Sequence, residues 1–149
     1  MNLLSEIRLK WYDDSSLMLE DRRELVKLFL NSLGVSRDVA ADIFEILLMA
    51  GAEDIAPTTA EIKERIIRLR RKRGIDTEKN LSDRNIQIWL KFFRDIELVQ
   101  RIGDRYMFSG NKKPSMAFVE HTKPDIIDRT SDYIYRLLGE IERRYEIKR

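Results

Sequence analysis

The residues from Ser82 to Gly110, SDRNIQIWLKFFRDIELVQRIGDRYMFSG, carry the side chains best suited to chemistry in this chain. A helical periodicity places one set of side chains on a single polar and basic face. Arg and Lys suit guanine edges and phosphates, Gln and Asn suit adenine, and an aliphatic group can meet a thymine methyl. The residues of this face are Arg84, Gln87, Ile88, Lys91 and Asp95, with Arg94 at its border.

The opposite face of the same segment predicts a helix that packs on a core. Its apolar residues follow the i, i+3, i+4, i+7 spacing: Ile86, Trp89, Leu90, Phe93 and Ile96. Ser82 is a suitable N-cap, and Asp83 suits the positive end of the helix dipole. The pattern predicts a helix over about 82–97.

A β-hairpin is predicted directly after this helix, over about 99–108. Gly103-Asp104 forms a two-residue turn of the glycine-first type between two short extended runs. Arg101 and Arg105 lie near the tip. Tyr106 and Phe108 could stack on the bases of a single strand, but packing in the core is the favoured interpretation.

Two interpretations fit the basic face. It is either an ordinary solvated face of an amphipathic helix or a surface that contacts nucleic acid. The distribution of charge favours the second. The chain has a net charge of +2, but residues 1–56 hold six Lys and Arg against eleven Asp and Glu, residues 57–113 hold fifteen against eight, and residues 114–149 hold seven of each. Clustered cations attract a polyanion and release its counterions.

The rest of the chain predicts further helices. They span about 2–12, with Leu4, Ile7 and Trp11 aligned, then 19–33, 36–50 with Ser36 as cap, and 58–73 with Thr58 or Thr59 at its start. A short extended link covers 55–57, and a polar connection covers 75–81. Trp11 and Trp89 lie on apolar stripes, so both are expected in the core.

The order helix, short link, helix, turn, helix, strand, strand resembles the winged helix-turn-helix family of archaeal and bacterial transcription regulators. The resemblance covers about residues 36–108, and its specific part is SDRNIQIWLKFFRDIELVQRIGDRYMF. It implies a mainly α fold, with three helices and a hairpin wing at 36–113, a helical extension at 1–35 and a C-terminal helix at 114–149. The connection of about eight residues before Ser82 departs from the usual ~3–4.

The resemblance also implies a function, sequence-specific binding of double-stranded DNA by a transcription regulator. Arg84, Asn85, Gln87, Ile88 and Lys91 would then face the major groove, and Arg101 and Arg105 would meet the backbone or minor groove. Winged helices also serve as protein-interaction modules in transcription or replication assemblies, and this is the alternative function. A transcription-machinery protein is therefore a possible partner.

The run KERIIRLRRKRG, residues 63–74, is the densest basic cluster. It is either a helix that contacts phosphates, through Lys63, Arg70 or Arg71, or a solvated helix whose cations pair with Glu61, Glu64 and other acids.

A C-terminal helix is predicted from a capping sequence at Thr122-Lys123-Pro124-Asp125. Its apolar stripe consists of Ile127, Ile134, Leu137, Leu138, Ile141 and Tyr145. The stripe either forms a homodimer or packs on the N-terminal helices of the same chain, and both can hold together. The homodimer is the favoured expectation.

The residue content argues against catalysis. His121 is the only histidine, there is no cysteine, and no glycine-rich phosphate loop is present. We therefore expect no enzyme activity, no cofactor and no metal. The absence of cysteine fits a reducing interior, and no apolar run approaches the ~20 residues of a membrane span. A secretory signal is not expected, and the predicted location is the cytoplasm.

Overall fold

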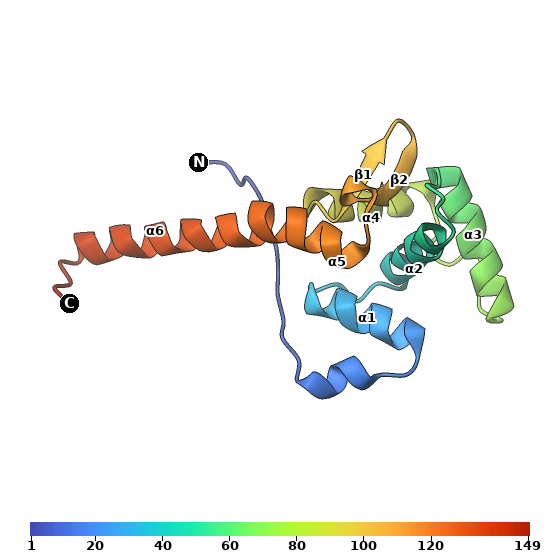
Figure 1. Cartoon of the computed structure of the whole chain (residues 1–149), viewed down its shortest axis with the longest axis horizontal. Helices are drawn as coiled ribbons and strands as arrows, with labels where there is room; N and C mark the ends of the chain where they lie inside the picture. Colours follow the sequence, from blue (N-terminus) through green and yellow to red (C-terminus); the bar gives the residue numbers. More distant parts are fainter.

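Helix α2 (Asp38–Ala52) forms the centre of the fold, because its side chains are buried on almost every side. The computed structural model describes residues 1–149. The ring of Phe44 lies 4.9 Å from Phe29 of α1 (Arg22–Ser32), 5.5 Å from Phe93 of α4 (Asp83–Asp95) and 5.6 Å from Phe108 of β2 (Arg105–Phe108), measured between centroids. One core therefore joins α1, α2, α4 and the hairpin (Figure 1).

The elements around α2 follow the predicted order. Helix α3 (Thr59–Lys72) precedes α4, and β1 (Val99–Ile102) pairs with β2 in a two-stranded antiparallel sheet. The register runs from Val99 opposite Phe108 to Ile102 opposite Arg105. Gly103 has a φ of +63°, as a glycine-first turn requires. The prediction of a mainly helical fold with one hairpin is confirmed.

The short link before α3 pairs with the hairpin. The carbonyl of Pro57 accepts a hydrogen bond of 2.9 Å from the backbone N–H of Tyr106, and Thr58 forms an isolated antiparallel bridge with Arg105. The start of α3 is therefore tied to the second strand of the hairpin. Tyr106 and Phe108 are buried, which confirms their predicted place in the core.

Side-chain caps set the starts of α3 and α4, as predicted. The hydroxyl of Thr58 accepts from the N–H of Glu61 at 3.2 Å, and the hydroxyl of Ser82 accepts from the N–H of Asn85 at 3.1 Å. The start of α2 differs from the prediction. Ser36 is not its cap; the cap position is Arg37, which makes no side-chain capping bond.

The predicted N-terminal helix over 2–12 is wrong. The segment has no regular structure and leads to a 3-10 turn, η1 (Asp14–Met18), while α1 begins after Asp21, whose carboxylate caps it. Trp11, expected in the core, is 96% exposed, and only Ile7 packs against the core. A helix of this length is marginal in water, and one partly buried side chain does not stabilise it. Trp89 is half-buried.

The C-terminal helix begins earlier than predicted. A continuous helical rod runs through α5 (Pro114–Ala117), a π-helical segment η3 (Phe118–Asp128) and α6 (Arg129–Arg144). Pro114 stands in its first turn, where a missing N–H costs nothing. Pro124 lies inside η3 instead of at a start, and the wider π geometry accommodates a residue that would disrupt an α-helix.

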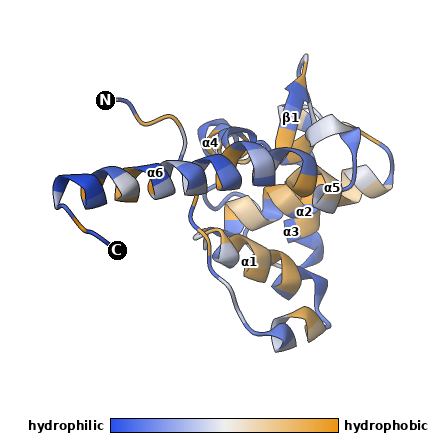
Figure 2. Ribbon diagram, turned by 60° about the vertical axis from the view of Figure 1, so that its left-hand side comes forward, coloured by the Kyte–Doolittle hydropathy of each residue, from blue (hydrophilic) through white to orange (hydrophobic).

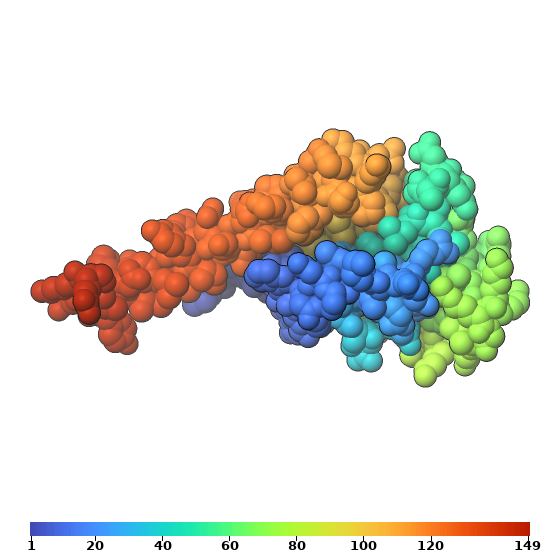
Figure 3. All heavy atoms as spheres, turned by 60° about the horizontal axis from the view of Figure 1, so that its bottom comes forward, coloured from blue at the N-terminus to red at the C-terminus, as the bar shows by residue number.

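Helix α6 projects from the body as an arm (Figures 1 and 3). None of its residues is buried, so the alternative interpretation, in which the stripe packs on the N-terminal helices, does not hold for α6 in this structure. Hydrophobic residues recur along the arm between hydrophilic ones (Figure 2). No helix in the structure combines the length and the apolar character needed to cross a bilayer.

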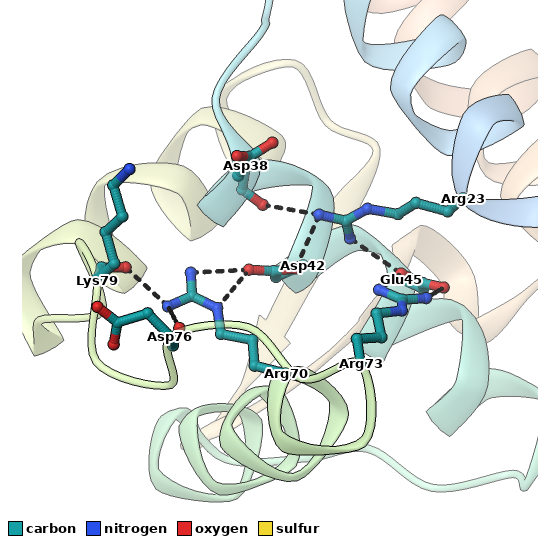
Figure 4. A network of polar contacts seen from close by, with 8 residues as sticks. All are labelled: Arg23, Asp38, Asp42, Glu45, Arg70, Arg73, Asp76 and Lys79. Carbon is teal, nitrogen blue, oxygen red and sulfur yellow. Dashed lines mark hydrogen bonds and ion pairs between the residues drawn. The ribbon is translucent and has the colours of Figure 1, made fainter.

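An ion network around the buried Asp42, Glu45 and Arg70 holds α3 against α1 and α2 (Figure 4). Nε and Nη2 of Arg70 donate to Oδ2 of Asp42 at 3.0 and 2.9 Å, and Nη1 of Arg70 donates to the carbonyl of Lys79 at 2.7 Å. Arg23 of α1 lies 2.9 Å from both Asp42 and Glu45, and Arg73 donates to Glu45 at 2.8 and 3.1 Å. The network therefore joins α1, α2, α3 and the connection that leads to α4.

The variant Asp42→Ala should destabilise the fold by about 3–5 kcal/mol, because it leaves the buried guanidinium of Arg70 without its counter-ion. Urea unfolding followed by circular dichroism measures the change. The control is Arg65→Ala, which removes a partly exposed pair with Glu53 and should change stability by about 0–1 kcal/mol. Similar losses in the two variants would contradict the role given to the buried pair.

Candidate nucleic-acid interface

Helix α4 presents its polar face as an exposed ridge. Ile86, Leu90 and Phe93 are buried beneath it, so the helix is anchored by its apolar side. The predicted outward side chains Arg84, Gln87, Lys91 and Arg94 are exposed. Ile88, on the same ridge, is 46% exposed.

The ridge side chains differ in how free they are. Arg84 and Arg94 form no ion pair and no side-chain hydrogen bond within the chain, so both guanidinium groups are available to a ligand. Lys91 lies 2.6 Å from Asp95, in an exposed pair that an incoming anion could replace. These three cations and Ile88 line the outer surface of α4.

Two amides of α4 are already engaged. The side-chain N–H of Asn85 donates to the carbonyl of Asn80 at 2.8 Å, and Asn85 is half-buried. The side-chain N–H of Gln87 donates to the hydroxyl of Thr59 at 3.0 Å. Asn85 therefore fixes the connection to α4, while the exposed Gln87 links α4 to the start of α3.

The hairpin arginines are exposed but only partly free. Nε of Arg101 donates to the carbonyl of Gly103 at 2.7 Å, which leaves the end of the guanidinium group open. Nη1 of Arg105 donates to the carbonyl of Ala56 at 2.8 Å and lies 3.7 Å from Glu61. Arg101 lines a groove together with residues of α4, whereas Arg105 lies beside the start of α3.

The basic side chains of α3 differ in their burial and in their partners. Arg70 is 4% exposed and bound to Asp42, so the prediction that it contacts phosphate is wrong. An arginine side chain can be buried to this extent only when a carboxylate compensates its charge. Arg71 is exposed and unpaired, and Lys63 lies 3.1 Å from the exposed Asp83 of α4.

Two grooves lie along the ridge of α4. The first, which we call the wing groove, has a volume of about 590 Å³ and is lined by Gln87, Lys91, Arg94, Arg101 and His121, among others. The second, the connection groove, has a volume of about 970 Å³ and lies between α4, the connection 73–82 and the start of α2. The ridge therefore stands between two grooves that each carry cations.

Sequence reasoning missed three cations of the connection groove: Lys27, Arg37 and Lys79. Lys27 and Arg37 belong to the part of the chain with excess acidic residues, which concealed them. These cations could have been found by asking which acids of the same segment are buried and paired. Asp42 and Glu45 form ion pairs with arginines inside the fold. The acidic excess of residues 1–56 therefore overstates the negative charge on the surface of that part of the chain.

The wing groove also contains a carboxylate with a perturbed pKa. Burial raises the pKa of Glu97, and the neighbouring Asp125 of η3 raises it further by its charge and by a hydrogen bond, against smaller opposing effects of His121 and Arg129. Glu97 follows α4 with a φ of +60°. This acid therefore lies at the junction between α4 and the C-terminal rod.

No protein-family model, no curated protein and no solved structure matches this chain. No group of three or more His, Cys, Asp or Glu side chains is placed to hold a metal ion. What the geometry offers is an exposed helix with unpaired cations, between two grooves.

The variant Glu97→Gln should raise stability at pH 7, because it imitates the protonated form that the folded state favours. The sign follows from the raised pKa: the charged carboxylate costs stability above the folded-state pKa, and that cost disappears as the pH falls. The advantage of the variant should shrink toward pH ~4.

Thermal unfolding at pH 7 and pH 4 measures this difference. The control is Glu142→Gln, which removes an exposed acid of α6 that forms no ion pair. A Glu97→Gln protein less stable than wild type at pH 7 would contradict the expectation.

Proposed function

We propose that this chain binds double-stranded DNA in a sequence-specific manner as a transcription regulator of the winged helix-turn-helix type, without catalysis, in the cytoplasm. The observation that carries the proposal is the exposed ridge of α4, on which Arg84, Lys91 and Arg94 accompany Gln87 and Ile88. A helix of about 10–12 Å diameter fits the major groove, which is about 12 Å wide.

The arrangement around the ridge supports this proposal. Helices α2, α3 and α4 precede the hairpin, and the Thr58–Arg105 bridge adds an extended residue beside it. In a winged helix the third helix reads base edges and the hairpin meets the backbone, which would give Arg101 and Arg105 their roles. Lys63 and Arg71 of α3 would then contact phosphates flanking the site.

DNA binding should weaken when the ridge is changed. We expect Arg84→Ala to reduce affinity for a selected duplex by about 5- to 150-fold, as the loss of one specific contact does. Lys91→Glu should reduce it further, because it places a negative charge against the polyanion. Fluorescence anisotropy with a duplex selected from a random pool measures both, and Arg136→Ala, on the exposed arm, is the control.

Unchanged binding by both ridge variants would exclude α4 as the reading helix. The absence of any enriched duplex from the random pool would count against the whole proposal. It would favour a winged-helix module that binds a transcription or replication protein. For that second function the specific observation is the exposure of Ile88 and of Ile102, which is 62% exposed at the end of the hairpin.

We also propose that the arm of α6 binds a second copy of this chain. The stripe of Ile134, Leu137, Leu138 and Ile141 is exposed along one face, and charged residues occupy the other. A helix of this length with Gly139 in its interior is marginal alone, and burial of the stripe would stabilise it. A second copy presents the same stripe, so a two-fold pairing covers both at once.

The variant Leu138→Glu should convert the dimer to a monomer at tens of micromolar, because it places a charge within the paired stripes. Multi-angle light scattering measures the mass. No residue of α6 is buried, so the variant should keep its fold by circular dichroism. Arg136→Glu, on the opposite face of α6, is the control and should remain dimeric; a monomeric wild-type protein would contradict the proposal.

A further inference from the structure

The connection groove lies on the side of α4 away from the hairpin. Six of its lining residues are Lys or Arg and three are Asp, whereas the wing groove has three Lys or Arg against one Asp and one Glu. The groove beside the hairpin, where sequence reasoning placed the backbone contacts, is therefore the less basic of the two.

Half of the cations in the connection groove are occupied. Arg23, Arg70 and Arg73 are bound to Asp42 and Glu45 in the ion network. The other three cations are Lys27, Arg37 and Lys79. Their side chains form no ion pair within 4.0 Å and no hydrogen bond within the chain.

The free cations come from three separate elements that the network holds together. Lys27 belongs to α1, Arg37 precedes α2, and Lys79 belongs to the connection. The carbonyl of Lys79 accepts from Arg70, while its ammonium group points away from the network (Figure 4). The lysine is thus fixed by its backbone and open at its charged end.

The acids of the connection groove do not pair with these three cations. Asp42 is buried and paired. Oδ1 of Asp76 accepts from the backbone N–H of Glu78 at 2.9 Å, so this carboxylate is engaged in its own turn. Asp38 stands in the first turn of α2, where the helix dipole favours a negative charge.

We propose that Lys27, Arg37 and Lys79 bind the phosphates of one DNA strand, on the side of α4 opposite the hairpin. The inference rests on the proposed function. A helix in the major groove lies between two phosphate backbones, one on each side. Arg94 and Arg101 of the wing groove face one backbone, and the three free cations face the other, so the ridge of α4 is held from both sides.

The test is the triple variant Lys27→Ala, Arg37→Ala, Lys79→Ala, titrated with duplex DNA at several salt concentrations. A cation that binds a phosphate releases a counterion, so the slope of log affinity against log salt should fall by about one for each residue, or about three in total. Affinity should fall by the same factor for the selected duplex and for a random duplex, because phosphates carry no sequence.

The matched control is Arg22→Ala, which removes an unpaired, exposed arginine of the same helix as Lys27, outside the groove. Its salt slope should equal that of wild type. None of the three substituted side chains is paired, so circular dichroism melting should show an intact fold.

The outcomes separate the inference from the proposed function. If wild type binds duplex and Arg84→Ala weakens it, but the triple variant behaves like Arg22→Ala, the second backbone contact is wrong and the reading helix stands. If the triple variant changes the ratio between selected and random duplex, these residues contact bases and the phosphate assignment is wrong. If wild type binds no duplex, both proposals fall.

Discussion

The ion pair between Asp42 and Arg70 sets the position of α4, on which the candidate interface depends. The two residues are 28 positions apart, and their contact is buried. Because Arg70 also donates to carbonyls of the connection, the same guanidinium group fixes the end of α3 and the chain that leads to Ser82. The longer connection between α3 and α4 is therefore held by an arginine from within, as an ordered part of the fold.

The network also decides which charges remain for a ligand. Burial raises the pKa of Glu45, but the hydrogen bonds and charges of Arg73 and Arg23 outweigh it and hold the pKa below its ordinary value. Glu45 thus stays charged at neutral pH and pairs with two arginines that count as basic in the sequence. Cations without partners therefore include Arg71 of the basic run, but others lie at the edges of the grooves, on α1, α4 and the connection. A surface that attracts a polyanion is defined by these unpaired groups and not by the local density of Lys and Arg.

The central elements were predictable because their signals are local. The periodicity and Ser82 predict α4. The threonine pair Thr58-Thr59 predicts the start of α3, and Gly103 predicts the hairpin turn. The fate of Arg70 was not predictable, because its partner Asp42 comes from a helix far away in sequence. The segment 2–12 shows the converse: its apolar spacing suits a helix, but the body offers a packing site only to Ile7. Periodicity indicates which side chains would share a face of a helix, and tertiary contacts decide whether that face is buried and the helix forms.

The two prolines of the C-terminal rod show how position changes the meaning of one residue type. Pro114 starts the rod, and Pro124 is absorbed into η3, so the rod does not break between the body and the arm. Ala117, Thr122 and Ile126 are buried, which anchors the first part, whereas α6 buries nothing. Under the proposed dimer, the anchored part would transmit the geometry of the paired arms to each body. The distance between two α4 ridges would then be set by the length and angle of one continuous rod. Such a constraint favours a fixed spacing between DNA half-sites, because a two-fold protein reads a two-fold sequence only when its reading helices keep that spacing.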